Sequence, residues 1–110
     1  MCVVVGNSFS LNMLGGDAVI ACRRITKDEF IERIREAQEL VSVIGHQGTA
    51  ELVSVLSGVR VEVNRVNFTL KDNDVLLVVV LRERLGEGIV LNKSEAERVG
   101  VDFWEVRKVQ

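Results

Sequence analysis

The sequence has no proline, one histidine and two cysteines in 110 residues. Because proline and low-complexity tracts are both missing, nothing marks a linker, and we expect one domain that spans residues 1–110. The spacing of Cys2 and Cys22 matches no zinc or redox motif, so each is expected to be a buried apolar side chain. With a single histidine and no accompanying ligand spacing, neither a metal site nor a cofactor is predicted.

The chain also lacks an excess of positive charge and a long apolar run. Its formal net charge is −2 and its isoelectric point is near 5.4, which argues against general binding of duplex DNA. A small anionic ligand stays compatible, because a few arginines in one cleft can outweigh a mildly negative surface. The longest strongly apolar run, 75–81, is far too short to span a bilayer, and the first residues lack the basic region of a signal peptide. A soluble cytoplasmic protein without membrane contact is therefore expected.

The hydrophobic fraction of 47% is enough for a folded core. The pattern predicts a single α/β domain with one mixed β-sheet of about five strands flanked by helices, in the order β-α-β-α-α-β-β-α-β. Alternating residues in 59–70, the polar turn 71–74 and the aliphatic run 75–81 predict a β-hairpin. Strands are expected at 2–6, 18–25, 59–70, 75–81 and 102–106. Helices are expected at 8–14, from 27, at 49–57 and from 94.

Short local signals predict where the helices begin and end. Thr26 with Glu29 forms a capping box, and Ser94 with Glu97 forms a second one. Gly58 is expected to end the helix over 49–57. The single tryptophan, Trp104, falls in the last predicted strand and is expected to anchor the core or an interface.

The single histidine, His46, lies between two glycines in Gly45-His46-Gln47-Gly48. No other side chain here titrates near neutral pH without a large environmental shift, so His46 is the first candidate for proton transfer. A serine-type triad is disfavoured because the sequence has no nucleophile elbow. The alternative is a loop histidine whose positive form suits the end of the preceding helix.

Two further clusters are candidates for ligand binding. Asn7-Ser8-Phe9-Ser10-Leu11-Asn12 follows the first strand, where α/β folds collect ligands, although these side chains can equally serve as helix caps. Arg65 and the arginines of segment 82–88 can clamp phosphate at strand ends, or can make ordinary surface ion pairs. Gly86 and Gly88 suggest a tight loop that fixes where Glu87 points.

Taken together, these clusters resemble one family over roughly residues 5–92. The family comprises the viral anti-CRISPR ring nucleases that destroy cyclic tetraadenylate, together with their cellular CRISPR-associated relatives. The matching text is Asn7-Ser8-Phe9-Ser10-Leu11-Asn12-Met13-Leu14, then Ile44-Gly45-His46 with Thr49, Leu52 and Leu56-Ser57-Gly58, then Asn64-Arg65-Val66, then Arg84-Leu85-Gly86-Glu87-Gly88-Ile89-Val90-Leu91. No single block is specific, but four blocks in the same order carry the resemblance.

The resemblance implies a homodimer that binds cyclic tetraadenylate across its interface, in the cytoplasm of a prokaryotic cell or an infected host. It implies that His46 is catalytic and that Arg84 and Glu87 are its partners. It also implies ligand contacts for a set of polar residues. These are Asn7, Ser10 and Asn12 near the nucleophilic ribose, and Arg65 on a phosphate.

The implied reaction needs no metal, because a ribose 2′-hydroxyl attacks the neighbouring phosphorus and the task is mostly alignment. His46 would donate a proton to the leaving oxygen, Arg84 would stabilise the charge on phosphorus, and Glu87 would favour the charged imidazole. The products are linear diadenylates with a 2′,3′-cyclic phosphate, and their formation switches off type III CRISPR signalling. Two alternatives stay open: a non-catalytic sensor of cyclic oligonucleotides, and a structural dimer that binds no nucleotide.

Overall fold

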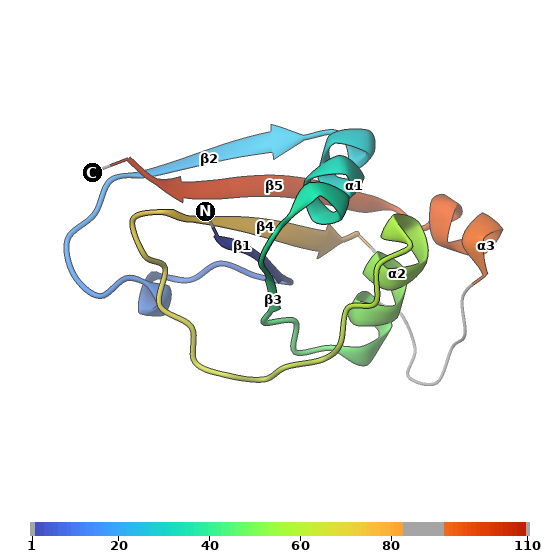
Figure 1. The fold of residues 1–110 in the computed structure, drawn as a ribbon, viewed down its shortest axis with the longest axis horizontal. Coiled ribbons are helices and arrows are strands. Elements are labelled where there is room, and N and C mark those ends of the chain that lie inside the picture. Colours follow the sequence, from blue (N-terminus) through green and yellow to red (C-terminus); the bar gives the residue numbers. More distant parts are fainter. Residues whose placement is uncertain (1, 83–91, 110) are drawn as a thin grey trace.

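Five strands form one mixed sheet in the computed structural model, which describes residues 2–82 and 92–109 (Figure 1). The strands are β1 (Cys2–Gly6), β2 (Ile20–Ile25), β3 (Leu40–Ser42), β4 (Asp74–Leu81) and β5 (Val101–Lys108). Their spatial order is β2-β5-β4-β1-β3. β1 runs parallel to its neighbours β3 and β4, whereas β5 is antiparallel to β4 and β2. The predicted α/β class with a mixed five-stranded sheet is confirmed.

In the described part of the chain, the helices are segregated by face of the sheet. Helices α1 (Lys27–Glu36), α2 (Gln47–Ser57) and α3 (Lys93–Arg98) pack on one face. In place of the helix predicted over 8–14, the structure has a single 3-10 turn, η1 (Leu11–Met13), which packs on the other face. None of these described helices is long and apolar enough to cross a membrane.

Local capping signals were good guides to the helix ends. Thr26 caps α1 by accepting a hydrogen bond from a first-turn N–H, and Gly58 ends α2 with a φ of +74°. The second predicted box is wrong, because the Asn92 side chain accepts the N–H of Glu95, so the N-cap lies two residues before Ser94 and α3 begins at Lys93. Asparagine caps helices at least as well as serine, so the earlier of the two residues takes the role.

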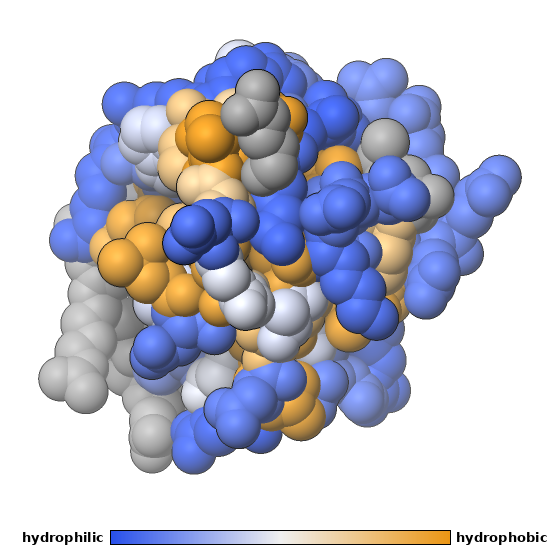
Figure 2. All heavy atoms as spheres, turned by 90° about the vertical axis from the view of Figure 1, so that its left-hand side faces the viewer, coloured by the Kyte–Doolittle hydropathy of each residue, from blue (hydrophilic) through white to orange (hydrophobic). Residues whose placement is uncertain are grey.

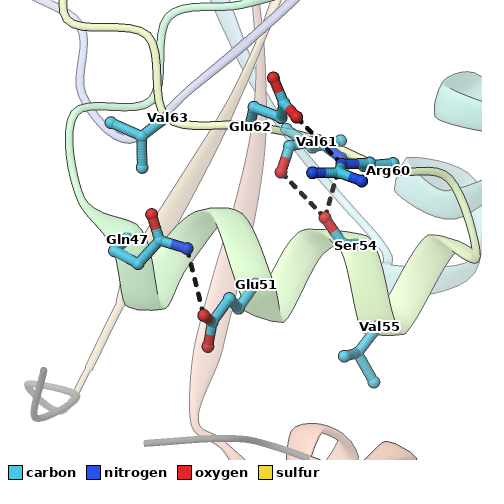
Figure 3. Close-up of a pocket in the computed structure, with 8 residues that line it drawn as sticks. All are labelled: Gln47, Glu51, Ser54, Val55, Arg60, Val61, Glu62 and Val63. Carbon is cyan, nitrogen blue, oxygen red and sulfur yellow. Dashed lines mark hydrogen bonds and ion pairs between the residues drawn. The ribbon is translucent and has the colours of Figure 1, made fainter. Parts of the chain in front are cut away.

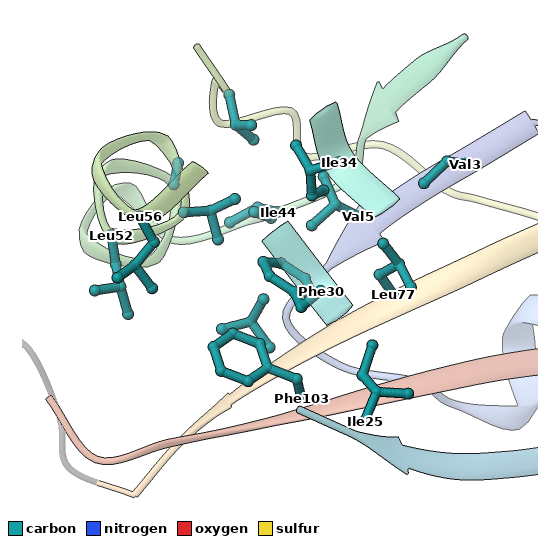
Figure 4. Close-up of a cluster of buried hydrophobic side chains, with 14 of the residues drawn as sticks. Val3, Val5, Ile25, Phe30, Ile34, Ile44, Leu52, Leu56, Leu77 and Phe103 are labelled. Atoms are coloured by element: carbon teal, nitrogen blue, oxygen red, sulfur yellow. The ribbon is translucent and has the colours of Figure 1, made fainter. Parts of the chain in front are cut away.

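Burial on both faces of the sheet explains why β4 is almost purely aliphatic. Alternate residues of β4 enter two separate clusters, one beneath the helices and one on the opposite face. Figure 4 shows the cluster beneath the helices, where Phe30 of α1 packs on Phe103 of β5 with ring centroids 4.5 Å apart. The central strand is therefore covered on both sides, as strands with parallel neighbours usually are.

The face without long helices is covered by η1 and by extended chain. Met13 and Phe68 pack there beside Trp104 of β5, which is half-buried against the core as predicted. Figure 2 views the left-hand end of the molecule and shows apolar patches divided by hydrophilic side chains. Leu11, in η1, is 77% exposed, so this covering segment leaves one large apolar side chain in solvent.

The cysteines are less buried than expected. Cys22 is exposed and Cys2 is half-buried. Cys22 lies on β2, an edge strand that begins at Ile20 rather than at the predicted residue 18 and that leaves most of its side chains in solvent. An edge strand has a neighbour on one side only, so an apolar residue there is not forced into the core.

The segment 59–70, here called the strap, was expected to be a strand but forms none. The three-residue strand β3 takes its place in the sheet, and the predicted hairpin is therefore wrong. The strap runs beside α2, passes the sheet edge at β3 and continues onto the opposite face (Figure 1). Accordingly, Val61 lies in the cluster beneath the helices and Leu70 in the cluster on the other face.

Serine side chains make the hydrogen bonds to the strap that a neighbouring strand would make. The N–H of Val61 donates to Ser54 Oγ over 2.8 Å, and the one proton of that hydroxyl is shared between the Ala50 carbonyl at 2.8 Å and the Val61 carbonyl at 3.0 Å. On β3, Ser42 Oγ donates to the Glu62 carbonyl over 2.6 Å. Alternation along the strap therefore reflects real packing, but the partner is a helix face with its serines, which a strand pattern cannot distinguish from a sheet.

Replacing Ser54 by alanine is expected to lower the free energy of unfolding by about 1–3 kcal/mol, since both backbone groups of the buried Val61 lose their partner. Urea unfolding measures the change. Ser94→Ala in the exposed first turn of α3 is the control and should change stability little. Equal stabilities of the two variants would contradict the role given to Ser54.

Glu105 of β5 is buried, with 7% of its side chain exposed, and arginines from three elements surround it. Arg33 Nη1 lies 2.7 Å from the carboxylate, Arg107 Nε lies at 3.0 Å and Arg23 Nη2 at 3.4 Å. Burial opposes ionisation of Glu105, but the hydrogen bond from Arg107 and the charges of all three arginines outweigh it, so the pKa of Glu105 is lowered. The cluster joins α1 to β5 and β2 through ionised groups.

A lowered pKa in the folded state stabilises the fold above the pKa of the unfolded chain, about 4.3 for glutamate. Wild-type protein is therefore expected to lose this stability as the pH falls through that value toward the lower pKa of folded Glu105. Glu105→Gln has nothing to protonate there and should lose less over the same interval, measured by urea unfolding at stepped pH. Glu62→Gln removes a carboxylate that pairs with Arg60 in solvent, and it should follow wild type. Parallel curves for wild type and Glu105→Gln would exclude this contribution.

Candidate functional site

The carboxyl ends of β1, β3 and β4 meet at one edge of the sheet, because these three strands run parallel. Asn7 follows β1 directly, and the connection from β3 leads through His46 into α2. Ligands of α/β folds gather outside the carboxyl ends of such strands. Two of the predicted site residues are therefore placed where the topology favours binding.

The backbone of Gly45 is held on both sides by predicted site residues, an arrangement that we call the Gly45 clamp. Its N–H donates to Asn7 Oδ1 over 3.1 Å, and its carbonyl accepts a hydrogen bond from Arg65 Nε over 2.8 Å. Beside it, the N–H of Asn64 donates to the Ile44 carbonyl over 2.8 Å and fixes the strap to the same connection. The end of β1, the strap and the residue before His46 are thereby brought together.

His46 is the N-cap of α2, and Thr49 supplies both hydrogen bonds that its ring makes within the described residues. His46 Nδ1 accepts the N–H of Thr49 over 3.3 Å and lies 3.4 Å from Thr49 Oγ1. A ring nitrogen that accepts an N–H carries a lone pair, so the proton of the neutral ring is on Nε2. The alternative that His46 serves the end of the preceding helix is wrong, because it begins α2 instead.

Asn7 and Arg65 keep hydrogen-bonding capacity for a ligand. Both side chains are exposed, and each uses one group on Gly45. Within residues 2–82 and 92–109, no further hydrogen bond or ion pair engages the Asn7 amide nitrogen or the terminal nitrogens of Arg65. The alternative that Asn7 caps the next helix is not what the fold uses, since its side chain bonds to the distant Gly45.

Ser10 and Asn12 are not brought to His46 within one chain. Ser10 precedes η1 without a side-chain capping bond, Asn12 lies in η1, and both are exposed. The carbonyl of Met13 accepts the N–H of Leu70 over 2.7 Å, which fixes η1 to the far end of the strap. Figure 1 accordingly places η1 well away from the start of α2.

Arg84 and Glu87 lie outside the described residues, so their predicted roles stay predictions. Just before them, Arg82 Nη2 pairs with Asp102 over 2.6 Å, and Arg24 pairs with the same carboxylate. The hydrogen bond from Arg82 and the charges of both arginines lower the pKa of Asp102 despite some desolvation. For Arg82, the alternative of a surface ion pair is the one that the structure bears out.

A groove of about 550 Å³ runs between α2 and the strap (Figure 3). Within the described residues, its lining includes neither His46 nor the side chains of the Gly45 clamp. The side chains that line it are Gln47, Glu51, Ser54, Val55, Arg60, Val61, Glu62 and Val63. No group of three or more His, Cys, Asp or Glu side chains that could hold a metal ion occurs in the ranges that the structure describes.

Comparison with known proteins finds similarity over most of the chain. A family model described as STIV B116-like matches residues 3–103. Uncharacterized protein 26 of Sulfolobus islandicus filamentous virus (isolate Iceland/Hveragerdi) is 33% identical over 91 residues, covering 82% of this chain and 76% of that protein. Uncharacterized protein ORF117 of Acidianus two-tailed virus is 40% identical over 73 residues, covering 66% and 62%. Among solved structures, B116 of Sulfolobus turreted icosahedral virus matches with a TM-score of 0.84 at 29% identity, covering 97% of this chain and 99% of B116.

Proposed function

The chain belongs to the STIV B116-like family, and from that premise we propose that it is a metal-independent ring nuclease that cleaves cyclic tetraadenylate. The products would be linear diadenylates that end in a 2′,3′-cyclic phosphate. Removal of this second messenger would switch off type III CRISPR signalling in the cytoplasm of a prokaryotic cell. The Gly45 clamp is the observation that carries the proposal, because it gathers Asn7 and Arg65 around the residue before His46.

These residues suit transesterification of a ribonucleotide. The 2′-oxygen forms a bond to phosphorus, the bond from phosphorus to the 5′-oxygen breaks, and that oxygen takes a proton from Nε2 of a protonated His46. The proton of the 2′-hydroxyl leaves to solvent. Arg65 offers its terminal nitrogens to a phosphate oxygen, and the amide of Asn7 can hold a ribose hydroxyl. Because nucleophile and phosphorus belong to one molecule, holding them in line does most of the work.

Replacing His46 is expected to slow cleavage by about 10²- to 10⁴-fold, the usual span for loss of a general acid. His46→Asn is the sharper variant, since asparagine keeps an N-cap for α2 and so separates chemistry from helix stability. The assay is incubation with cyclic tetraadenylate in EDTA, with products identified by mass spectrometry. His46→Ala and His46→Asn should fail alike. An unchanged rate in His46→Asn would dismiss the mechanism.

Arg65 is expected to act in binding. Arg65→Ala should raise KM by about 10- to 100-fold, as expected when a charged hydrogen-bond donor to phosphate is lost. Arg60→Ala is the matched control, because Arg60 lies on the same strap, its side chain is 86% exposed and it pairs with Glu62. Steady-state kinetics gives the KM of both variants. Equal KM values for Arg65→Ala and Arg60→Ala would contradict a role of Arg65 in binding the substrate.

The proposal includes a homodimer, because a two-fold pair presents each site twice to a ring of compatible symmetry. Such a pair would also account for Ser10 and Asn12, which lie away from His46 of their own chain and would serve the site of the partner. Light scattering at assay concentration should give twice the chain mass. A monomer under those conditions would contradict the shared pocket.

The cleavage assay also separates the enzyme from a sensor. Intact ring that co-elutes with the protein would indicate a non-catalytic binding protein that uses the same pocket. Failure to bind any cyclic oligonucleotide would leave only the fold.

A further inference from the structure

We propose that Thr49 is a positioning residue for His46, and that its hydroxyl supports the ring nitrogen Nδ1 in both charge states of the imidazole. The catalytic part of this inference rests on the proposed function. Thr49 lies in the first turn of α2 and is 2% exposed. Its hydroxyl oxygen lies 3.4 Å from Nδ1, and the structure gives this hydroxyl no other hydrogen bond within the described residues.

The backbone N–H of Thr49 can serve only one form of the ring. It donates to Nδ1 over 3.3 Å, which requires a lone pair on that nitrogen. A histidine that acts as a general acid must first be an imidazolium, with a proton on each ring nitrogen. It remains protonated on Nδ1 after Nε2 has given its proton to the 5′-oxygen. In the imidazolium, and in the neutral ring that is left after the transfer, Nδ1–H therefore faces the Thr49 N–H. An N–H is a donor and cannot accept a hydrogen bond.

The hydroxyl of Thr49 solves this conflict, because a hydroxyl both donates and accepts. In the neutral ring at rest it can share the single lone pair of Nδ1 with the Thr49 N–H, and it can rotate to accept from Nδ1–H of the imidazolium. The ring therefore does not have to turn when it is protonated, and Nε2 stays directed away from the helix end. Burial of Thr49 keeps water from competing for the same contact.

The effect depends on the hydroxyl rather than on the shape of the side chain. Thr49→Val keeps the branched shape and the backbone N–H that donates to His46 Nδ1, and it removes only the hydroxyl. Thr49→Ser keeps the hydroxyl and loses a methyl group. The first variant is expected to lower kcat about tenfold with KM within about twofold of wild type, because binding of cyclic tetraadenylate does not use Nδ1 of His46. The second should retain most of kcat.

A spectrum of the free protein tests the contact without any substrate. At a pH where the imidazole is fully charged, a ¹H–¹⁵N spectrum of wild type should show an Nδ1–H of His46 that is protected from exchange. Thr49→Ser should keep this resonance and Thr49→Val should lose it, with thermal unfolding confirming that both variants are folded. A protected Nδ1–H in Thr49→Val would overturn the contact.

The kinetic measurement and the spectrum test different parts of the inference, so each can give a negative result without the other. If wild type does not cleave cyclic tetraadenylate, the proposed function fails, while the spectrum still decides whether Thr49 holds the charged ring. If Thr49→Val loses the resonance but keeps the wild-type kcat, the contact exists and its part in catalysis is refuted. Loss of both the resonance and kcat in Thr49→Val, with both retained in Thr49→Ser, is the result that we expect.

Discussion

The candidate site depends on how the backbone of one residue, Gly45, is held. Its N–H and carbonyl bond to side chains from the end of β1 and from the strap, and the next residue is the single histidine. A Cβ at this position would lie 3.6 Å from Arg65 Cγ, an ordinary contact. The arrangement therefore rests on the two hydrogen bonds and not on the absence of a side chain. Each bond fixes a side chain that we propose contacts the ligand, together with the entry to α2.

The features that sequence predicts well are those decided within a few residues. Thr26 caps α1 by accepting the N–H of Glu29 in the first turn, and Gly58 ends α2 by adopting a left-handed φ, so neither depends on the rest of the fold. The aliphatic run in β4 similarly predicts a strand that is buried on both faces. Parallel pairing then brings the strand ends together, and with them Asn7 and His46.

The strap and β3 show where such reasoning ends. Alternating residues predict that a segment has one apolar side. They do not predict whether its backbone hydrogen-bonds to a neighbouring strand or to the side chains of a helix. Here the side chains of Ser54 and Ser42 make hydrogen bonds to the backbone of the strap. The sheet is completed instead by the three residues of β3, whose sequence has no strong strand pattern. Thr49 was missed as a partner of His46, because histidine is not among the residues that commonly cap helices and its spacing to Thr49 gave no signal.

The dependence of the strap on serine side chains has a consequence for the order of folding. Ser54 can receive the strap only after α2 has formed, because only a helix presents its hydroxyl on the face that the strap follows. The sheet contains parallel pairs between distant segments, whose closure is slow. We therefore expect Arg65 to reach Gly45 late in folding, after both α2 and the sheet have formed. Opening of the exposed stretch around Arg65 would then be a local event, because Val61 and Leu70 on either side of it can stay in the two core clusters while Arg65 leaves the site.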